Sequence, residues 1–121
     1  MRSSFGRDAM RFKALSVKQP YASMIAQGSK TIETRNWPTK YRGDLLIVST
    51  QKPMIPGLPS GKAVCIAKLV DCRPTLVGDE GRARCDVWYK GAWAWVLEDI
   101  RPIQPFSVRG HLKLYDVEIE E

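Results

Sequence analysis

The sequence predicts a small, mainly β domain with a minor α+β content: a closed or nearly closed barrel of about six strands with one short helix across its end. Three observations lead to this prediction. The patterned segments are short and extended, only one segment has helical spacing, and the strand–helix alternation typical of a parallel sheet does not recur. A barrel is the simplest arrangement of such strands, because closure leaves no edge strand exposed.

The length and composition indicate one soluble domain. We expect residues 1–9 to be a flexible leader and residues 10–121 to form the domain, since the first patterned run begins at Phe12. The chain is 44% apolar and 26% charged, and no apolar run reaches the ~18 residues of a membrane helix. The leader lacks the apolar core of a secretory signal, so the sequence predicts a cytoplasmic protein with no membrane partner.

Metal and cofactor sites are not expected. The three cysteines, Cys65, Cys72 and Cys85, are odd in number and widely spaced, and His111 is the only histidine. The sequence therefore lacks the ligand spacing of a zinc site and the residues of a histidine-based triad. We predict free cysteines, no metal and no cofactor.

A strand and a helix open the domain. Residues 12–18 alternate in character, which predicts a strand. Pro20 suits the first turn of a helix, and we expect this helix over residues 20–27, where apolar side chains recur at helical spacing. Gly28 follows as a typical left-handed stop.

The later strands are predicted from alternation or from continuous apolar runs. Residues 45–50 form a continuous apolar run, which is typical of a strand buried on both faces. Residues 51–61, rich in Pro and Gly, predict a surface loop, and the polar residues 73–91 predict a mobile one. The remaining strands are expected at residues 31–37, 62–71, 92–97 and 113–120, and residues 98–105 are expected to continue the third of these irregularly through Pro102.

The positive charge is concentrated in one part of the chain. The net charge is +6, and residues 11–52 alone hold eight basic and two acidic residues, a net of +6. Residues 53–121 hold nine basic and ten acidic residues, a net of −1, and residues 1–10 supply +1. Such clustering suits a polyanionic partner, with nucleic acid first among the candidates.

The stretch from Gly28 to Arg35 places three charged side chains within this basic part. Residues i and i+2 of a strand share a face, so Glu33 and Arg35 are expected to project together, with Lys30 at the mouth of the strand. The spacing alone is equally compatible with a solvated surface pair of about 0–1 kcal/mol.

Four residues of this stretch occupy every defined position of the G-x-K-x-x-E-x-R signature: Gly28, Lys30, Glu33 and Arg35. On this basis the chain resembles the ASCH domain family, over roughly residues 12–119. The resemblance implies a PUA-like β-barrel with a cleft where the helix meets the barrel mouth, lined by the Lys, Glu and Arg of the motif. It also implies a role in RNA metabolism or regulation.

The first functional hypothesis is a binding module for RNA, other single-stranded nucleic acid or a free nucleotide, whether or not its base is modified. Lys30 and Arg35 would bind a phosphate or a base edge. Glu33 would accept a hydrogen bond from an exocyclic amine of the base or would orient Arg35. Tyr21 and Trp37 would stack a base or pack in the core. The expected ligand-binding residues are Lys18, Gln19, Tyr21, Lys30, Glu33, Arg35, Trp37 and Arg42.

The alternative is a hydrolase acting on RNA or on a modified nucleoside such as N4-acetylcytidine. Lys30 would act as base or electrostatic stabiliser and Glu33 as general acid or base. The amidohydrolase branch of the family carries a Thr nucleophile three residues after the motif Lys, and this chain has Glu33 there. A carboxylate does not replace that hydroxyl, so the sequence favours binding. A weaker third hypothesis is a protein adaptor using the Pro-rich residues 53–59.

Overall fold

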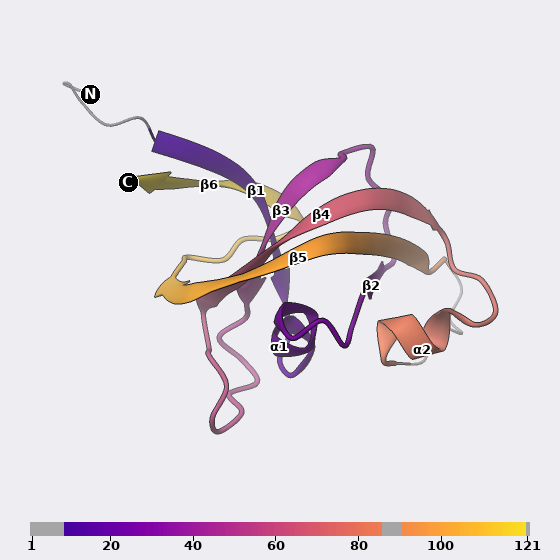
Figure 1. Ribbon diagram of the computed structural model, residues 1–121, viewed down its shortest axis with the longest axis horizontal. Coiled ribbons are helices and arrows are strands. Elements are labelled where there is room, and N and C mark those ends of the chain that lie inside the picture. Colours follow the sequence, from indigo (N-terminus) through magenta and orange to yellow (C-terminus); the bar gives the residue numbers. More distant parts are fainter. Residues whose placement is uncertain (1–8, 86–90, 121) are drawn as a thin grey trace.

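One mixed sheet of six strands makes up most of the protein (Figure 1). The computed structural model describes residues 9–85 and 91–120. Its elements are, in chain order, β1 (Ala9–Val17), α1 (Tyr21–Ala26), β2 (Ile32–Arg35), β3 (Gly43–Ser49), β4 (Lys62–Pro74), α2 (Asp79–Ala83), β5 (Trp93–Ser107) and β6 (Leu114–Glu120). Ala9, the last residue of the expected leader, already belongs to β1, and residues 1–8 lie outside the described part.

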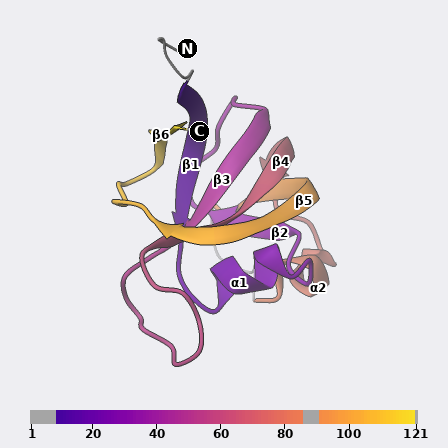
Figure 2. The same ribbon diagram turned by 60° about the vertical axis from the view of Figure 1, so that its left-hand side comes forward.

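The strands lie in the order β2-β5-β4-β3-β1-β6. All neighbours are antiparallel except β1 and β3, whose parallel pairing requires a crossover connection, and this connection carries α1 and β2. The sheet is strongly twisted, so that β5 crosses β1 and β3 at a steep angle (Figure 2). The predicted mainly β, PUA-like fold is confirmed, with β2 and β6 at the two ends of the hydrogen-bonded order in the described residues.

The main core lies between the sheet and α1, which contributes Ala22 and Ile25. Residues 45–49 of β3 are buried without interruption, as the apolar run predicts, because both faces of this strand are covered. Ile47 belongs to the main core, while Leu46 packs in a second cluster with Tyr115 on the opposite face. The other main-core residues are Leu15, Val17, Leu45, Val64, Cys65, Ala67, Leu69, Trp95 and Leu97.

The segment expected as a mobile loop, residues 73–91, is partly ordered. β4 continues to Pro74, and α2 follows within the same segment, while residues 86–90 lie outside the described part. Asp79 explains the start of α2: its carboxylate accepts from the Leu76 N–H at 2.7 Å and from Arg73 Nη1 at 2.9 Å. In the described part of the chain neither helix is long enough to cross a membrane, since α1 has six residues and α2 has five.

Two strands differ in length from the expected ones. β2 ends at Arg35 rather than at residue 37, because Pro38 follows and the chain leaves the sheet. β5 runs as one strand from Trp93 to Ser107, so residues 98–105, where an irregular continuation is expected, belong to the strand itself. Beyond Val96 it no longer pairs with β2, so its second half has one open edge, and proline is tolerated in such edge segments.

Gly28 ends α1 in the left-handed region, with φ of +84°. Its N–H donates to Ile25 O at 2.9 Å, and the Ser29 N–H donates to Met24 O at 3.0 Å, which satisfies the last carbonyls of the helix. The next residue but one is Lys30, so this turn directs the motif lysine.

We expect Gly28→Ala to lower the free energy of unfolding by about 1 kcal/mol. A Cβ at Gly28 meets nothing within 4 Å, so the cost comes from the backbone conformation alone. Gly81→Ala is the matched control: Gly81 lies within α2, its Cβ position is equally open, and alanine should stabilise the helix by up to about 1 kcal/mol. Urea denaturation measures both, and equal stability of Gly28→Ala and the wild type would contradict the assignment.

Candidate functional site

A cleft of about 370 Å³ opens where α1 meets the ends of β1 and β2. Its size is within the range of small-molecule sites. It is lined by Val17, Lys18, Tyr21, Lys30, Glu33, Thr34, Arg35, Asn36 and Cys85. Five of the eight predicted ligand-binding residues therefore lie together at this cleft.

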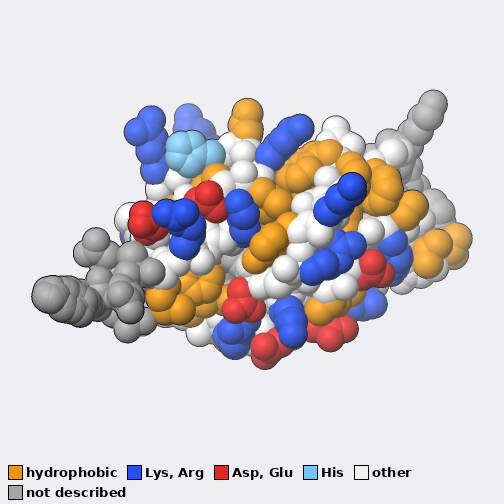
Figure 3. Space-filling model, turned by 90° about the horizontal axis from the view of Figure 1, so that it is seen from above, with side chains coloured by type: hydrophobic (Ala, Val, Ile, Leu, Met, Phe, Trp, Pro, Cys, Tyr) orange, Lys and Arg blue, Asp and Glu red, His pale blue; other side chains and the backbone are white. Residues whose placement is uncertain are grey.

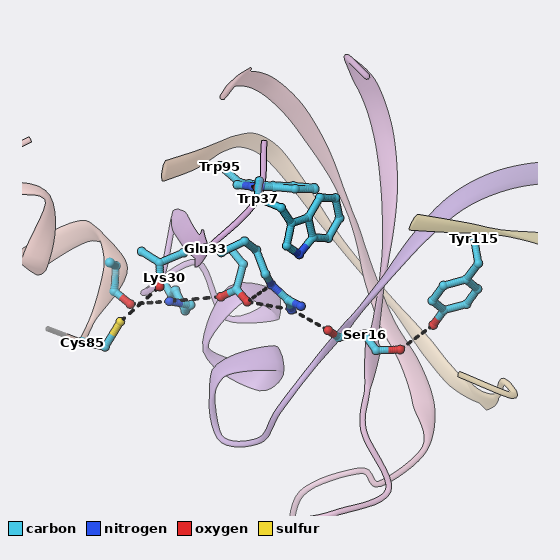
Figure 4. Close-up of polar contacts among 10 residues, drawn as sticks. Ser16, Lys30, Glu33, Trp37, Cys85, Trp95 and Tyr115 are labelled. Carbon is cyan, nitrogen blue, oxygen red and sulfur yellow. Dashed lines mark hydrogen bonds and ion pairs between the residues drawn. The ribbon is translucent and has the colours of Figure 1, made fainter. Parts of the chain in front are cut away.

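A chain of ion pairs forms the floor of the cleft (Figure 4). Lys30 Nζ lies 3.4 Å from Glu33 Oε1, and Glu33 Oε2 lies 3.0 Å from Arg35 Nε and 2.9 Å from Arg35 Nη2. The side chains of Lys30 and Glu33 are only 1% and 10% exposed, and that of Arg35 is 23% exposed. The motif is thus a buried network, and the interpretation as a solvated surface pair does not apply.

Lys30 is held from three sides. Its ammonium donates to the main-chain oxygen of Ala83 at the end of α2 and lies beside Glu33. The ring centroid of Tyr21, on α1, is 5.0 Å from Nζ, which is within the range of a cation–π interaction. The site therefore depends on α2, which has no clear signal in the sequence.

Arg35 connects two parts of the sheet that do not pair. β6 pairs with β1 only as far as Leu15, so the next residue, Ser16, lies beyond this ladder. Arg35 Nη2 donates to the Ser16 carbonyl at 2.6 Å and so joins β2 to the end of β1. The Ser16 hydroxyl lies 2.7 Å from Tyr115 Oη, which ties the same point to β6 (Figure 4).

The ionisable groups of the cleft carry a net positive charge. The negative charge of Glu33 offsets one of the two positive charges of Lys30 and Arg35, so one positive charge remains. The exposed Lys18 adds a second positive charge at the rim. Elsewhere on the surface, the face in Figure 3 shows basic side chains spread widely and fewer acidic ones among them. The cleft can therefore attract an anion.

Gln19 lies outside the cleft and is buried. Its Oε1 accepts from the Ser23 N–H at 2.9 Å, and its Nε2 donates to Ser23 Oγ at 2.8 Å and to Pro59 O at 2.9 Å. This side chain therefore secures the start of α1 and attaches the 51–61 loop to it.

Trp37 and Arg42 also lie outside the cleft. Trp37 packs edge-to-face on Trp95, with ring centroids 4.7 Å apart, so the core-packing role is the one observed. Arg42 lines a separate hollow and lies 3.8 Å from Asp71. Ligand contact by these residues stays a prediction.

Four cleft residues were missed from the sequence: Val17, Thr34, Asn36 and Cys85. Strand alternation places Thr34 on the opposite face of β2 from Glu33, yet Thr34 also borders the cleft. Thr34 lies within the motif, between Glu33 and Arg35, and Asn36 directly follows it, so their position in the sequence is a usable signal. Cys85 reaches Thr34, at 3.9 Å between Sγ and Oγ1, only through the fold.

All three cysteines are free, as predicted. Burial raises the pKa of Cys65 to about 12, so its thiol stays protonated at neutral pH. In residues 9–85 and 91–120, no group of three or more His, Cys, Asp or Glu side chains is placed to hold a metal ion.

The family of the chain follows from comparison with known proteins. A family model described as "ASCH domain" matches residues 15–107. The chain belongs to the ASCH domain family. The ASCH domain is 48% identical over 42 residues to human activating signal cointegrator 1, a match that covers 35% of this chain and 7% of that protein. The mouse protein of the same name is 47% identical over 38 residues, 31% of this chain and 6% of that protein.

Solved structures share the fold. The crystal structure of ASCH from Zymomonas mobilis has a TM-score of 0.63 at 23% identity, and the match covers 79% of this chain and 73% of that one. A point variant of that protein gives a TM-score of 0.61 at 24% identity, with 78% and 72% covered.

Lys30→Met should lower the free energy of unfolding by about 3 kcal/mol, because Glu33 and the Ala83 carbonyl would each lose a buried partner. Adding Glu33→Gln should restore part of this loss. Lys18→Met, at an exposed position, is the control and should stay within about 0.5 kcal/mol of the wild type. Denaturant unfolding compares them; a small loss on Lys30→Met would show that the pair is not needed for folding.

Asp79→Asn should destabilise the protein by about 1–2 kcal/mol at pH 7. Hydrogen bonding to Arg73 lowers the pKa of Asp79 below its ordinary value, so the stabilisation is complete above about pH 4 and is lost as the pH falls further. The unfolding free energies of wild type and variant should converge below that pH. Curves that stay parallel from pH 7 to 3 would contradict this role.

Proposed function

We propose that this ASCH domain binds a nucleotide of single-stranded RNA in the cleft, with a role in RNA metabolism or regulation in the cytoplasm. The observation that carries the proposal is the buried network of Lys30, Glu33 and Arg35 at the floor of a cleft with net positive charge. Membership of the family, with the RNA-related roles it implies, supports the same proposal.

Arg35 and Lys18 are the proposed phosphate ligands. Glu33 and the Ser16 carbonyl hold Nε and Nη2 of Arg35, whereas Nη1 makes no hydrogen bond to any described residue. A guanidinium fixed in this way presents its remaining N–H donors without losing further side-chain freedom. Lys18 is exposed at the rim and supplies a second cation.

Tyr21 is the proposed stacking partner for the base. It is the first residue of α1, and its half-buried side chain lines the cleft. The Lys30 ammonium below the ring holds it in place. Stacking of a base on an aromatic side chain contributes about 1–3 kcal/mol and tolerates any base.

Glu33 is assigned the orienting role. Both its carboxylate oxygens already have cationic partners, Lys30 and Arg35, so little capacity remains to accept from an exocyclic amine. The same contacts oppose hydrolysis by Lys30 and Glu33, which would have to give up these partners to transfer protons. Binding is therefore the function that the geometry supports best.

Fluorescence anisotropy with a labelled single-stranded hexanucleotide tests the proposal. Tyr21→Leu should raise Kd at least about fivefold through lost stacking. Lys18→Ala should reduce the slope of log Kd against log salt by about 0.7, the value for one phosphate contact to a single strand. Lys52→Ala removes an equally exposed charge from the 51–61 loop and is the control.

A Lys18→Ala/Tyr21→Leu protein that binds the hexanucleotide as tightly as the wild type would refute this site. Analysis of the recovered RNA separates binding from turnover. Shortened RNA, or deacetylated product from N4-acetylcytidine assayed in parallel, that disappears in Lys30→Ala would replace the proposal with the hydrolase alternative.

A further inference from the structure

A second hollow, of about 620 Å³, lies beyond the end of β2. We infer that it holds a neighbouring nucleotide of the same RNA strand, so that the ligand is an oligonucleotide rather than a free nucleotide. This inference rests on the proposed function of the cleft. The hollow is lined by Pro38, Thr39, Lys40, Arg42, Cys72 and Trp93.

The hollow combines an aromatic wall with two cations. Trp93 is half-buried, and Lys40 and Arg42 are exposed. The sequence favours core packing for Trp93, because its strand has no basic residue interleaved, and part of its side chain does pack against the main core. The fold brings the cations to it from the 38–42 segment, and an aromatic face beside basic side chains is the usual platform for single-stranded nucleic acid.

The two cations are available to an anion. Within the described residues Lys40 makes no ion pair, and no acidic side chain lines the hollow. Arg42 Nη1 donates to Thr39 O at 3.0 Å and to Tyr41 O at 2.8 Å, which holds the guanidinium beside the hollow. Its only ion pair there, with Asp71 at 3.8 Å, joins two exposed side chains and is weak.

The hollow adjoins the cleft. The lining of the cleft ends at Asn36 and that of the hollow begins at Pro38, with Trp37 between them. Arg35 on β2 pairs directly with Trp93 on β5, and cross-strand partners project from the same face with Cβ atoms about 4.5–5.5 Å apart. An RNA chain with one phosphate bound to Arg35 can therefore place its next base against Trp93.

The test compares uridine monophosphate with hexauridylate by isothermal titration. The wild type should bind the hexamer more tightly than the monomer. Lys40→Ala/Arg42→Ala should weaken hexamer binding about tenfold, leave monomer binding unchanged and reduce the salt slope by about 1.4. Lys52→Ala/Lys68→Ala removes two exposed charges elsewhere and is the matched control.

Trp93→Leu adds a second measurement and should weaken hexamer binding at least about fivefold without affecting the monomer. Equal affinity of the wild type for monomer and hexamer would overturn the second site and leave the cleft intact. An equal loss in the Lys40/Arg42 variant and its control would also overturn it. If neither ligand binds, the proposed function itself fails, and the second site with it.

Discussion

The buried carboxylate of Glu33 is the constraint on which the rest of the site depends. A buried charge is costly unless it is paired and hydrogen-bonded, and here a lysine and an arginine both meet the same carboxylate. The surrounding elements supply these partners. β2 places Glu33 and Arg35 on one face, and the left-handed turn at Gly28 delivers Lys30 from the end of α1.

Arg35 serves the fold and the site through one guanidinium. A main-chain carbonyl beyond the end of a ladder needs another hydrogen-bond partner, and Arg35 is that partner for Ser16, where the ladder between β1 and β6 has ended. The contact with Ser16 holds the end of β1, whose next residues, Val17 and Lys18, line the cleft. The shape of the cleft is therefore coupled to the contact that joins β2 to the end of β1.

Local pattern was sufficient to predict much of this fold. The unbroken apolar run of β3, the spacing in α1 and the stop at Gly28 each reflect short-range physics, and each agrees with the structure. The five-residue α2 was not predictable, because it is too short to show a hydrophobic period and begins with Asp79 contacts to residues before it.

The candidate site was predictable in part. The motif spacing brought Lys30, Glu33 and Arg35 to one place, yet spacing does not specify burial, which depends on packing by α1 and α2. Cys85 reaches the cleft only through tertiary structure, and tertiary structure likewise places Lys40 and Trp93 at the same hollow. Conversely, Gln19 is close to the motif in sequence, but its amide is used to hold α1 and the 51–61 loop.

Outside the motif, Lys30 donates a hydrogen bond to the main-chain oxygen of Ala83, and Arg35 donates one to the main-chain oxygen of Ser16. A carbonyl is present whichever amino acid occupies the position, so these contacts constrain backbone placement and impose little on residue identity. Pairwise covariation between positions 30 and 83, or 35 and 16, should accordingly be weak across the family. Coevolution-based contact maps would then understate the coupling at this site, even though the motif letters themselves are easy to recognise.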